Sequence, residues 1–547
     1  MHKETLQLLA GMVLVMSNAV DAAPALHIER LSPCGPWAPG PPRVWCVQVA
    51  GMGEAMPEVL LDGTPVPAAK VSREGQTLRF ELPRRQLASG PLWLRDEPRE
   101  SNPTWLSMGQ SHVQAARREH QVLIADRLVT VLDLVGLLLR EDVDGLTEAR
   151  RIAQAHGLEI VGAIAPLNIY QVRLPSTTLL ERDAQVRALG RDPAVAAVLV
   201  EDDNLDGGPR PDRPVPAPDR EGWVANRFEP AVELYRRHAR EVSAPHHVTV
   251  GVIEKGVNFD SPDFAELATP SGHAGVCLNA RHSTAANAHG SIVTGVLAAR
   301  IMPGGNRGLL SRIGALGEGF RVIVDRGSEN GVLGRVAASV NLVQDHARVL
   351  NWSWGVHRLG KRDRDGEPVT ANVRSELAFT GYAQLLRRFF AWLERDHADV
   401  LVVNSAGNSA TTTEDHLPSA LRYPQLLVVG AHQRSGRDVA VDDARFVMPR
   451  GKSNVGPRID ITAAACPRPP VTTAPQLGRG SGCGTSYAAA LVTAVVAAML
   501  AVNPDLHPTQ IKTLLQRSAM PAFGQSARLD MREALRQAMH SRVQRDG

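Results

Sequence analysis

Residues 484–490 read Gly-Thr-Ser-Tyr-Ala-Ala-Ala, and an apolar run continues from them to Val502. The glycine favours a turn and the run favours a helix, so Ser486 is predicted at a helix N-terminus. Unpaired backbone N–H groups and the helix dipole stabilise developing negative charge there, which suits a serine nucleophile. A hydroxyl needs a neighbouring base for this role. The alternative is an ordinary N-cap serine.

Outward from this stretch, residues 223–537 alternate between predicted strands and helices. Strands are expected at 248–253, 321–324, 348–351, 400–404 and 426–429, and helices at 289–300, 332–346 and 486–502. This alternation predicts an α/β fold, a mostly parallel sheet with helices on both faces. In such sheets reactive residues gather at the carboxyl ends of the strands.

Two residues at such ends are candidates for a base and an acid. His289 opens the predicted helix 289–300, and Gly290 beside it permits close backbone approach. Glu254 directly follows the strand 248–253, where a carboxylate can orient an imidazole. The alternatives are a structural histidine and an exposed strand-end glutamate.

A fourth candidate is Asn408, which ends the small-residue turn Ser405-Ala406-Gly407-Asn408 after the strand 400–404. Its side-chain N–H, together with the backbone N–H of Ser486, would form a two-donor oxyanion hole. The alternative is an asparagine that adopts a left-handed turn.

The region 223–537 resembles the catalytic domain of subtilisin-like serine proteases, the subtilases (peptidase S8 type). Five segments carry the resemblance: residues 250–257, 289–295, 351–355, 405–408 and 484–489. The resemblance implies that Ser486 is the nucleophile, His289 the base and Asn408 the oxyanion asparagine. It also implies that Ser353, Trp354 and Gly355 bind an extended substrate by strand addition, beside Ala406 and Gly407.

The chain departs from the family pattern at three positions. Glu254 stands where the family normally has aspartate, so an extra methylene must be accommodated; Asp263 is a less favoured substitute. Ala490 replaces a proline usual after the start of the nucleophile helix. Trp354 replaces a smaller apolar residue, and its ring is expected to narrow or reshape a subsite.

The front of the chain divides into further predicted parts. Residues 1–23 are typical of a signal peptide, with a short N-terminal anchor as the alternative. Residues 24–108 predict a small β domain, and 114–203 a ferredoxin-like α+β module that resembles the family's propeptide. A proline-rich linker covers 204–222, the catalytic domain 223–537 and a tail 538–547. No stretch after the signal is expected to be long and apolar enough to form a membrane helix, so no stable membrane insertion is expected once the signal is removed.

Composition excludes some classes of partner. A net charge of +3 over 547 residues, with scattered arginines, does not indicate nucleic acid. Cys34 with Cys46 and Cys466 with Cys483 are predicted disulfides, which leaves Cys277; five separate thiols are the alternative. No cofactor or metal site is predicted, and although many subtilases hold structural calcium, no calcium ligands are identified here. The sequence does not indicate an oligomeric state.

The sequence therefore predicts a secreted or periplasmic serine endopeptidase that acts on protein or peptide substrates through Glu254, His289 and Ser486. Three rivals remain: a catalytically impaired pseudoprotease that binds proteins, an esterase using the same site, and a partner-binding or adhesion protein acting through the N-terminal β domain.

Overall fold

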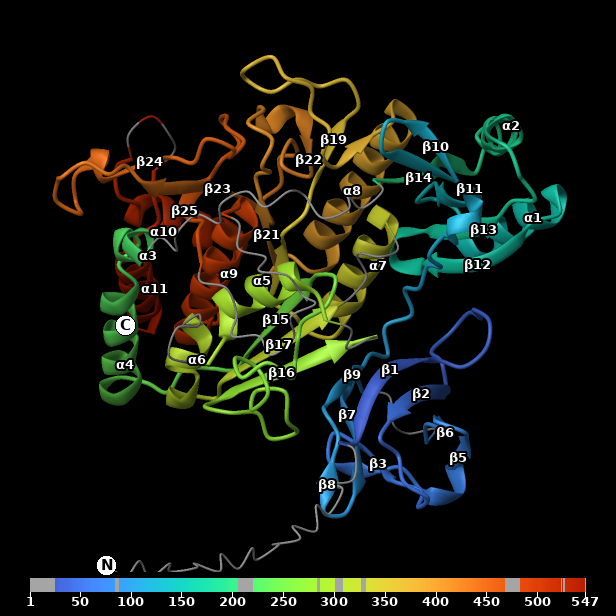
Figure 1. Ribbon diagram of the computed structural model, residues 1–547, viewed down its shortest axis with the longest axis horizontal. Helices are drawn as coiled ribbons and strands as arrows, with labels where there is room; N and C mark the ends of the chain where they lie inside the picture. Colours follow the sequence, from blue (N-terminus) through green and yellow to red (C-terminus); the bar gives the residue numbers. More distant parts are fainter. Residues whose placement is uncertain are drawn as a thin grey trace, which may run out of the picture.

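The computed structural model describes residues 25–83, 88–204, 220–282, 286–300, 308–325, 331–467, 483–522, 524 and 527–546 (Figure 1). The predicted signal peptide and residues 205–219 of the predicted linker lie outside the described residues. Helix α11 (Met531–Asp546) runs through the domain boundary expected at residue 537.

A mostly parallel sheet occupies the centre of the molecule, as the alternating pattern predicted. Its order across the described strands is β24-β23-β21-β18-β15-β17-β16, and it continues into β9-β7-β3-β4. Its strands in the C-terminal half are β15 (Val248–Ile253), β16 (Val276–Arg281), β17 (Phe320–Asp325), β18 (Val349–Trp352), β21 (Leu401–Ser405), β23 (Leu426–Arg434), β24 (Val447–Pro449) and β25 (Ile461–Ala464). All of these pair in parallel with their neighbours except β24, which is antiparallel to β23.

Helices cover both faces of this sheet, and strand β15 shows why. Val248, Val250 and Val252 pack into one apolar core, whereas Ile253 packs into the other. A strand buried on both faces needs an unbroken apolar run, which is the pattern at 248–253. The first core includes α4 (Phe228–Glu241), α5 (Ala288–Ala298), α6 (Leu309–Ile313), α9 (Thr485–Val502), α10 (Pro508–Ser518) and α11; the second includes α7 (Gly331–Gln344) and α8 (Glu376–Asp396).

Helix α9 is the central helix of the first core. All 18 of its residues are buried. Its side chains, many of them small or β-branched, pack against the sheet and against α5 and α11. By length and composition alone it would be long and apolar enough to cross a membrane, which corrects the expectation that no such segment follows the signal. Complete burial in the protein core accounts for its apolar composition without a membrane.

The strands of residues 25–108 form two groups around a core of their own. β1 (His27–Pro33), β2 (Val44–Ala50), β6 (Thr77–Glu81) and β5 (Val71–Glu74) make an antiparallel sheet in that order. The other strands extend the central sheet, because β9 pairs with β16 at Thr104 and Ala280. They are β3 (Glu58–Leu61), β4 (Thr64–Pro65), β7 (Gly90–Asp96), β8 (Arg99–Glu100) and β9 (Thr104–Leu106). The sequence did not indicate this continuity.

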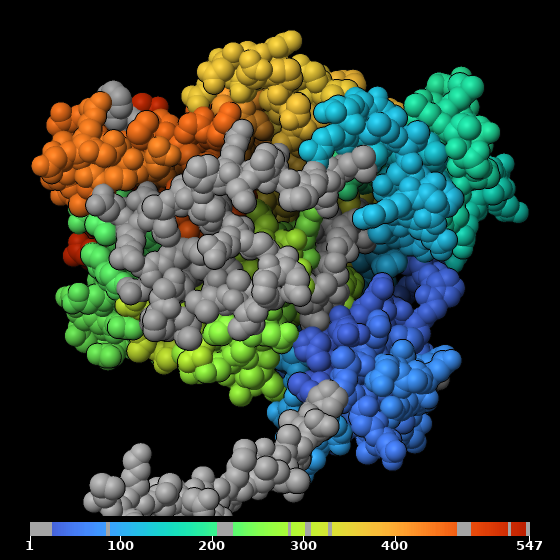
Figure 2. Space-filling view, viewed as in Figure 1, coloured from blue at the N-terminus to red at the C-terminus, as the bar shows by residue number. Residues whose placement is uncertain are grey.

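Polar contacts fix this junction as well. The indole N–H of Trp105 donates to the Asp345 carboxylate at 2.8 Å, and Arg321 lies over the same ring at 5.1 Å. Asn341 exchanges two hydrogen bonds with the backbone of Ser111, at 3.0 and 2.7 Å. Figure 2 shows the described residues of 25–108, in blue, against one side of the rest of the molecule.

Residues 114–204 form a second antiparallel sheet with two helices. The order of elements is β10 (Gln121–Ala125), β11 (Leu128–Leu139), α1 (Gly145–His156), β12 (Glu159–Ile164), β13 (Ile169–Arg173), α2 (Leu179–Leu189) and β14 (Val195–Asn204). β11 pairs with β10, β13 and β14, and β12 lies beyond β13. The side chain of Asp144 caps α1 by accepting from the Thr147 N–H, and Gly157 ends that helix with a φ of 64°.

The last strand of this module, β14, docks on the N-termini of α7 and α8 (Figure 1). The Glu201 carboxylate accepts from the backbone N–H groups of Val332 and Leu333 at 3.2 and 2.9 Å. Asp202 accepts from the N–H of Ser375, the N-cap of α8, at 2.8 Å. Carboxylates placed at helix N-termini complement the unpaired N–H groups and the helix dipole.

Both expected disulfides are present, between Cys34 and Cys46 and between Cys466 and Cys483, and Cys277 is a free, half-buried thiol. The first disulfide links the start of β2 to the end of β1. The second brings the segment after β25 next to the N-terminus of α9.

Candidate active site

The carboxyl edge of the central sheet brings the predicted residues into one region. Glu254 directly follows β15, and the segment 353–355 follows β18. Asn408 lies in the turn after β21, while His289 and Ser486 lie in the first turns of α5 and α9, which pack against each other. Five segments that are far apart in the sequence therefore meet at one edge.

Glu254 and His289 form a direct pair. The imidazole Nδ1 and the carboxylate Oε2 are 2.9 Å apart. The Glu254 side chain is 5% exposed, whereas that of His289 is 42% exposed, so the carboxylate lies behind the ring and the ring faces outward. Such a carboxylate holds the imidazole in one tautomer, with Nε2 as the free acceptor.

The charge of Glu254 sets the basicity of the ring. Burial alone would lower the pKa of His289, but the negative charge of Glu254 and its hydrogen bond outweigh burial, so the pKa lies above its ordinary value. The positive charges of Lys255 and Arg335 oppose this rise. The carboxylate therefore stabilises the imidazolium that would form when His289 accepts a proton.

The loop that carries Glu254 packs closely against the start of α5. A Cβ added to Gly290 would lie 2.0 Å from the Gly256 carbonyl oxygen and 3.3 Å from the Glu254 Cβ. The loop after β15 can therefore approach α5 only because residue 290 has no side chain. Asn287 caps the helix by accepting from the N–H groups of His289 and Gly290, at 2.9 and 3.3 Å. The sequence reasoning did not assign this role to Asn287.

Ser486 is 6% exposed and contacts the predicted substrate-binding segment. Its hydroxyl donates to the Ser353 carbonyl at 3.3 Å, and the Ser353 hydroxyl donates to the Ser486 carbonyl at 3.0 Å. No hydrogen bond joins Ser486 and His289, both of which are described. The ring of the next residue, Tyr487, lies 5.7 Å from the imidazole, so the two helix starts are neighbours. Hydrogen bonds at catalytic sites without substrate are often long or misaligned.

Asn408 is oriented by the helix that carries Ser486. Its side-chain carbonyl accepts from the Thr485 N–H at 2.9 Å and from the Thr485 hydroxyl at 3.3 Å. This fixes the carboxamide through its oxygen and leaves Nδ2 as a donor close to Gly484. The Ser486 N–H is a second donor, because the first N–H groups of a helix have no acceptor within it.

Asn454, which the sequence reasoning missed, holds the turn that carries Asn408. Its amide donates to the Ala406 carbonyl at 2.8 Å and accepts from the N–H groups of Ser409 and Thr411. Gly407 has a φ of 100°, and a Cβ there would lie 2.4 Å from the Asn454 amide nitrogen. The turn therefore requires glycine at 407, and no local sequence signal points to Asn454.

His416 is buried beneath both predicted substrate-binding segments. A Cβ at Gly355 would lie 2.1 Å from the His416 ring, and one at Gly407 would lie 2.9 Å from it. Its Nδ1 pairs with the Ser419 hydroxyl, which donates to Asn404, and the Asn404 amide donates to the carbonyls of Trp352 and Trp354. Burial lowers the pKa of His416 well below its ordinary value, so the ring is neutral and acts as a support.

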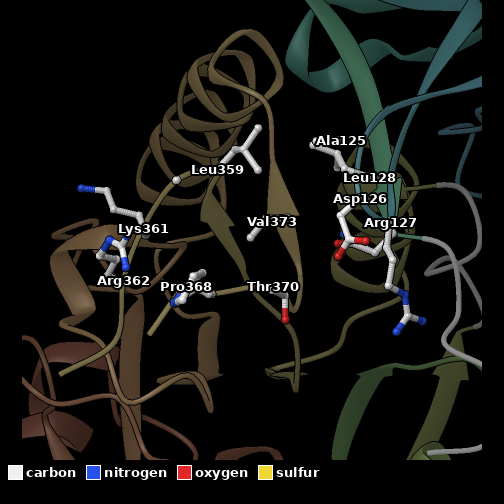
Figure 3. A pocket seen from close by; sticks show the side chains of 13 residues that line it. Ala125, Asp126, Arg127, Leu128, Leu359, Lys361, Arg362, Pro368, Thr370 and Val373 are labelled. Atoms are coloured by element: carbon white, nitrogen blue, oxygen red, sulfur yellow. The ribbon is translucent and has the colours of Figure 1, made fainter. Parts of the chain in front are cut away.

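A separate pocket of about 220 Å³ lies away from these residues (Figure 3). It opens between the β10–β11 hairpin and the loop from Leu359 to Val373, and Leu128, Val369 and Val373 form an apolar contact at its base. None of the predicted catalytic residues lines it. The pocket lies where the 114–204 module contacts the rest of the chain. In the described ranges, no group of three or more His, Cys, Asp or Glu side chains is arranged to hold a metal ion.

Comparison with known proteins shows the family to which the chain belongs. The model of the subtilase family matches residues 246–544, more than half of the chain. The chain therefore belongs to the subtilase family, and it is a serine-type endopeptidase. No curated protein matches it.

Several solved structures are similar at low identity. The epidermin leader peptide processing serine protease of Staphylococcus aureus is 14% identical, with 74% of this chain and 99% of that chain covered and a TM-score of 0.49. Fervidolysin of Fervidobacterium pennivorans, a keratinolytic enzyme related to subtilisin, is 18% identical over 80% of this chain and 64% of its own, with a TM-score of 0.48. The A-subunit of the AB5 toxin from E. coli is 18% identical over 58% and 98%, with a TM-score of 0.40.

Proposed function

We propose that the chain is a secreted or periplasmic endopeptidase that hydrolyses peptide bonds through Glu254, His289 and Ser486. The observation that carries the proposal is the 2.9 Å pair of Glu254 and His289, with the ring next to Tyr487 at the start of the helix that bears Ser486. A buried acid, an imidazole and a helix-terminal hydroxyl in this order are the groups that acyl transfer requires.

In the proposed reaction, a bound substrate displaces the Ser486 hydroxyl from the Ser353 carbonyl and turns it toward His289. The oxygen of Ser486 attacks the scissile carbonyl while Nε2 of His289 takes the hydroxyl proton. The C–N bond then breaks, and His289 returns that proton to the leaving amine. Water repeats both steps on the acyl-enzyme, which frees the acid product and restores Ser486. Glu254 keeps its hydrogen bond to Nδ1 of His289 and stabilises the imidazolium.

Labelling with a serine-directed fluorophosphonate tests the proposal directly. Mass spectrometry of the purified, labelled protein is expected to find the adduct on Ser486, because only an activated serine reacts readily. The same spectra report the N-terminus of the chain. Labelling on another serine, or none in a protein that unfolds cooperatively, contradicts the proposal.

The tetrahedral intermediate is proposed to be stabilised by Nδ2 of Asn408 and the Ser486 N–H. Asn408→Ala is expected to lower kcat by about 10²- to 10³-fold with a smaller change in KM, because the donor acts on charge that develops in the transition state.

Asn408→Asp is the matched control for this donor. It keeps an oxygen to accept the Thr485 N–H but removes the amide N–H. If Asn408 mainly positions α9, the aspartate variant should recover activity and the alanine variant should not. If the donor matters, both variants should be slow.

The predicted substrate segments contribute in different ways. The backbone groups of Ala406 and Gly407 are already used, since Ala406 N–H donates to Val429 and Gly407 N–H to the Thr485 hydroxyl. We therefore propose that these two residues line the substrate-binding site without forming backbone hydrogen bonds to the substrate. Ser353, Trp354 and Gly355 are proposed to pair with the extended substrate.

Residues 114–203 are proposed to be a ferredoxin-like propeptide, and the predicted linker 204–222 the place of its cleavage. Support comes from the element order β11-α1-β12-β13-α2-β14 and from the docking of Glu201 and Asp202 on the N-termini of α7 and α8. A new N-terminus within 205–222 in the mass spectra is the expected result.

A further inference from the structure

Trp354, in the proposed substrate-pairing segment, has an indole N–H with no acceptor. The ring is only 8% exposed, and in the described part of the chain its Nε1 is buried without a hydrogen-bond partner. A buried donor left unpaired costs about 1–3 kcal/mol. Such a donor beside a substrate segment points to an acceptor that the substrate supplies.

Arg335 of α7 lies over the same ring, with its guanidinium carbon 5.0 Å from the ring centre. Its Nε is also buried without a partner among the described residues. The cation and the indole N–H are thus adjacent, and within the described residues neither Arg335 Nε nor Trp354 Nε1 donates a hydrogen bond to a carboxylate. A carboxylate is the group that satisfies both, because guanidinium and carboxylate form charge-assisted hydrogen bonds.

The chain contains a completed version of the same arrangement. Arg321 lies over the Trp105 ring at 5.1 Å, and there the indole N–H donates to the carboxylate of Asp345 at 2.8 Å. Both pairs have an arginine over a buried tryptophan, but only the Trp105 indole has its carboxylate.

The carboxylates whose charges act on Arg335 have other partners, and Asp203 among them lies 3.4 Å from the Arg374 guanidinium. Burial and then the positive charge of Arg374 lower the pKa of Arg335, while Asp203, Glu254 and Glu201 oppose this. Glu201 accepts from Tyr382 at 2.8 Å and from the N-terminus of α7, and Glu254 pairs with His289. Arg335 therefore lies between the catalytic pair and the acidic end of β14, with its charge only partly balanced.

We propose that Arg335 and Trp354 form a subsite for an acidic side chain, so that the enzyme prefers peptides with glutamate or aspartate near the scissile bond. The proposal rests on the proposed endopeptidase function and names its substrate class. The acidic side chain would accept from the Trp354 N–H and from the Arg335 guanidinium.

Kinetics of the full-length protein on a peptide series test the subsite. A neutral fluorogenic peptide carries one glutamate, moved in turn from the fifth residue before the scissile bond to the third after it, with glutamine and lysine at the same positions. At one position glutamate should raise kcat/KM by about 10- to 100-fold over glutamine, as a charge-assisted hydrogen bond allows.

Three variants and one control assign this preference. Arg335→Gln should reduce the glutamate-to-glutamine ratio to about one, and Arg335→Glu should favour lysine instead. Trp354→Phe removes only the N–H and should lower the ratio several-fold. Arg321→Gln, which opens the other Arg–Trp pair, should keep the wild-type ratio.

The outcomes separate the subsite from the catalytic proposal. Cleavage of all peptides with no glutamate preference, or a preference unchanged in Arg335→Gln, overturns the subsite alone. Where Arg335→Gln does not fold, an unchanged ratio in Trp354→Phe overturns it. A protein that cleaves no peptide and is not labelled at Ser486 overturns both proposals.

Discussion

Replacing Ser486 by alanine is expected to lower kcat for peptide cleavage by about 10⁴- to 10⁶-fold. The reaction needs an oxygen that attacks the substrate carbonyl, and alanine has none. KM should change little, because the Ser486 side chain is small and 6% exposed, and the substrate is proposed to bind along Ser353–Gly355. Activity is measured with a quenched fluorescent peptide, and fluorophosphonate labelling should be lost in parallel.

Ser541→Ala is the control for this loss. Its hydroxyl lies on α11 and contacts Asn503 and Ala538, away from the carboxyl edge of the sheet. This variant should keep wild-type turnover. Full activity in Ser486→Ala would show that another nucleophile carries the reaction.

Substitutions of Glu254 test whether glutamate at this position impairs turnover or supports it. Glu254→Asp is expected to lower kcat by about 10²-fold, because shortening the side chain by about 1.5 Å withdraws the carboxylate from an imidazole that it already meets at 2.9 Å. Glu254→Gln should cost about 10⁴-fold, since an amide can hold the wrong tautomer of His289 and cannot stabilise the imidazolium.

The pH dependence follows from the same pair. Neutral His289 is the active base, so kcat/KM should fall as the pH drops through the histidine pKa. Glu254 raises that pKa, and Glu254→Gln removes the charge that raises it. The acidic limb of the profile should therefore move to lower pH in the glutamine variant and stay closer to wild type in Glu254→Asp.

One outcome for Glu254→Asp would contradict the expected loss of turnover. A large gain in turnover in Glu254→Asp would mean that glutamate impairs the enzyme, as the pseudoprotease hypothesis requires. The packing of Gly290 against Gly256 favours the opposite outcome, because the loop and helix already approach closely around the longer side chain.

Local patterns were enough to predict the layers of the fold. An unbroken apolar run gave β15 its exact bounds, and the apolar run after Ser486 gave α9 to within one residue. Asp144 and Gly157, at the two ends of α1, are also residue types that favour helix termini. These features depend on propensity and capping, which act over a few residues.

Features that depend on tertiary contact could not be predicted in the same way. Asn454 supports the turn at Gly407 from 47 positions along the chain, and His416 supports Gly355 from below. Neither residue lies in a recognisable local pattern. The Arg335–Trp354 contact is of the same kind, because it joins a helix to a strand end through side-chain orientation alone.

The pairing of β9 with β16 has a consequence for the solubility of the protein. Without residues 25–108, β16 would be the outermost strand of the subtilase sheet, with a free row of N–H and C=O groups that another copy could pair with. In the whole chain β9 pairs with β16 at one position, Thr104 with Ala280, and the sheet continues through β7 and β3 to β4, which is two residues long and ends in Pro65. A version that starts at residue 114 should therefore self-associate in solution more than the whole chain does.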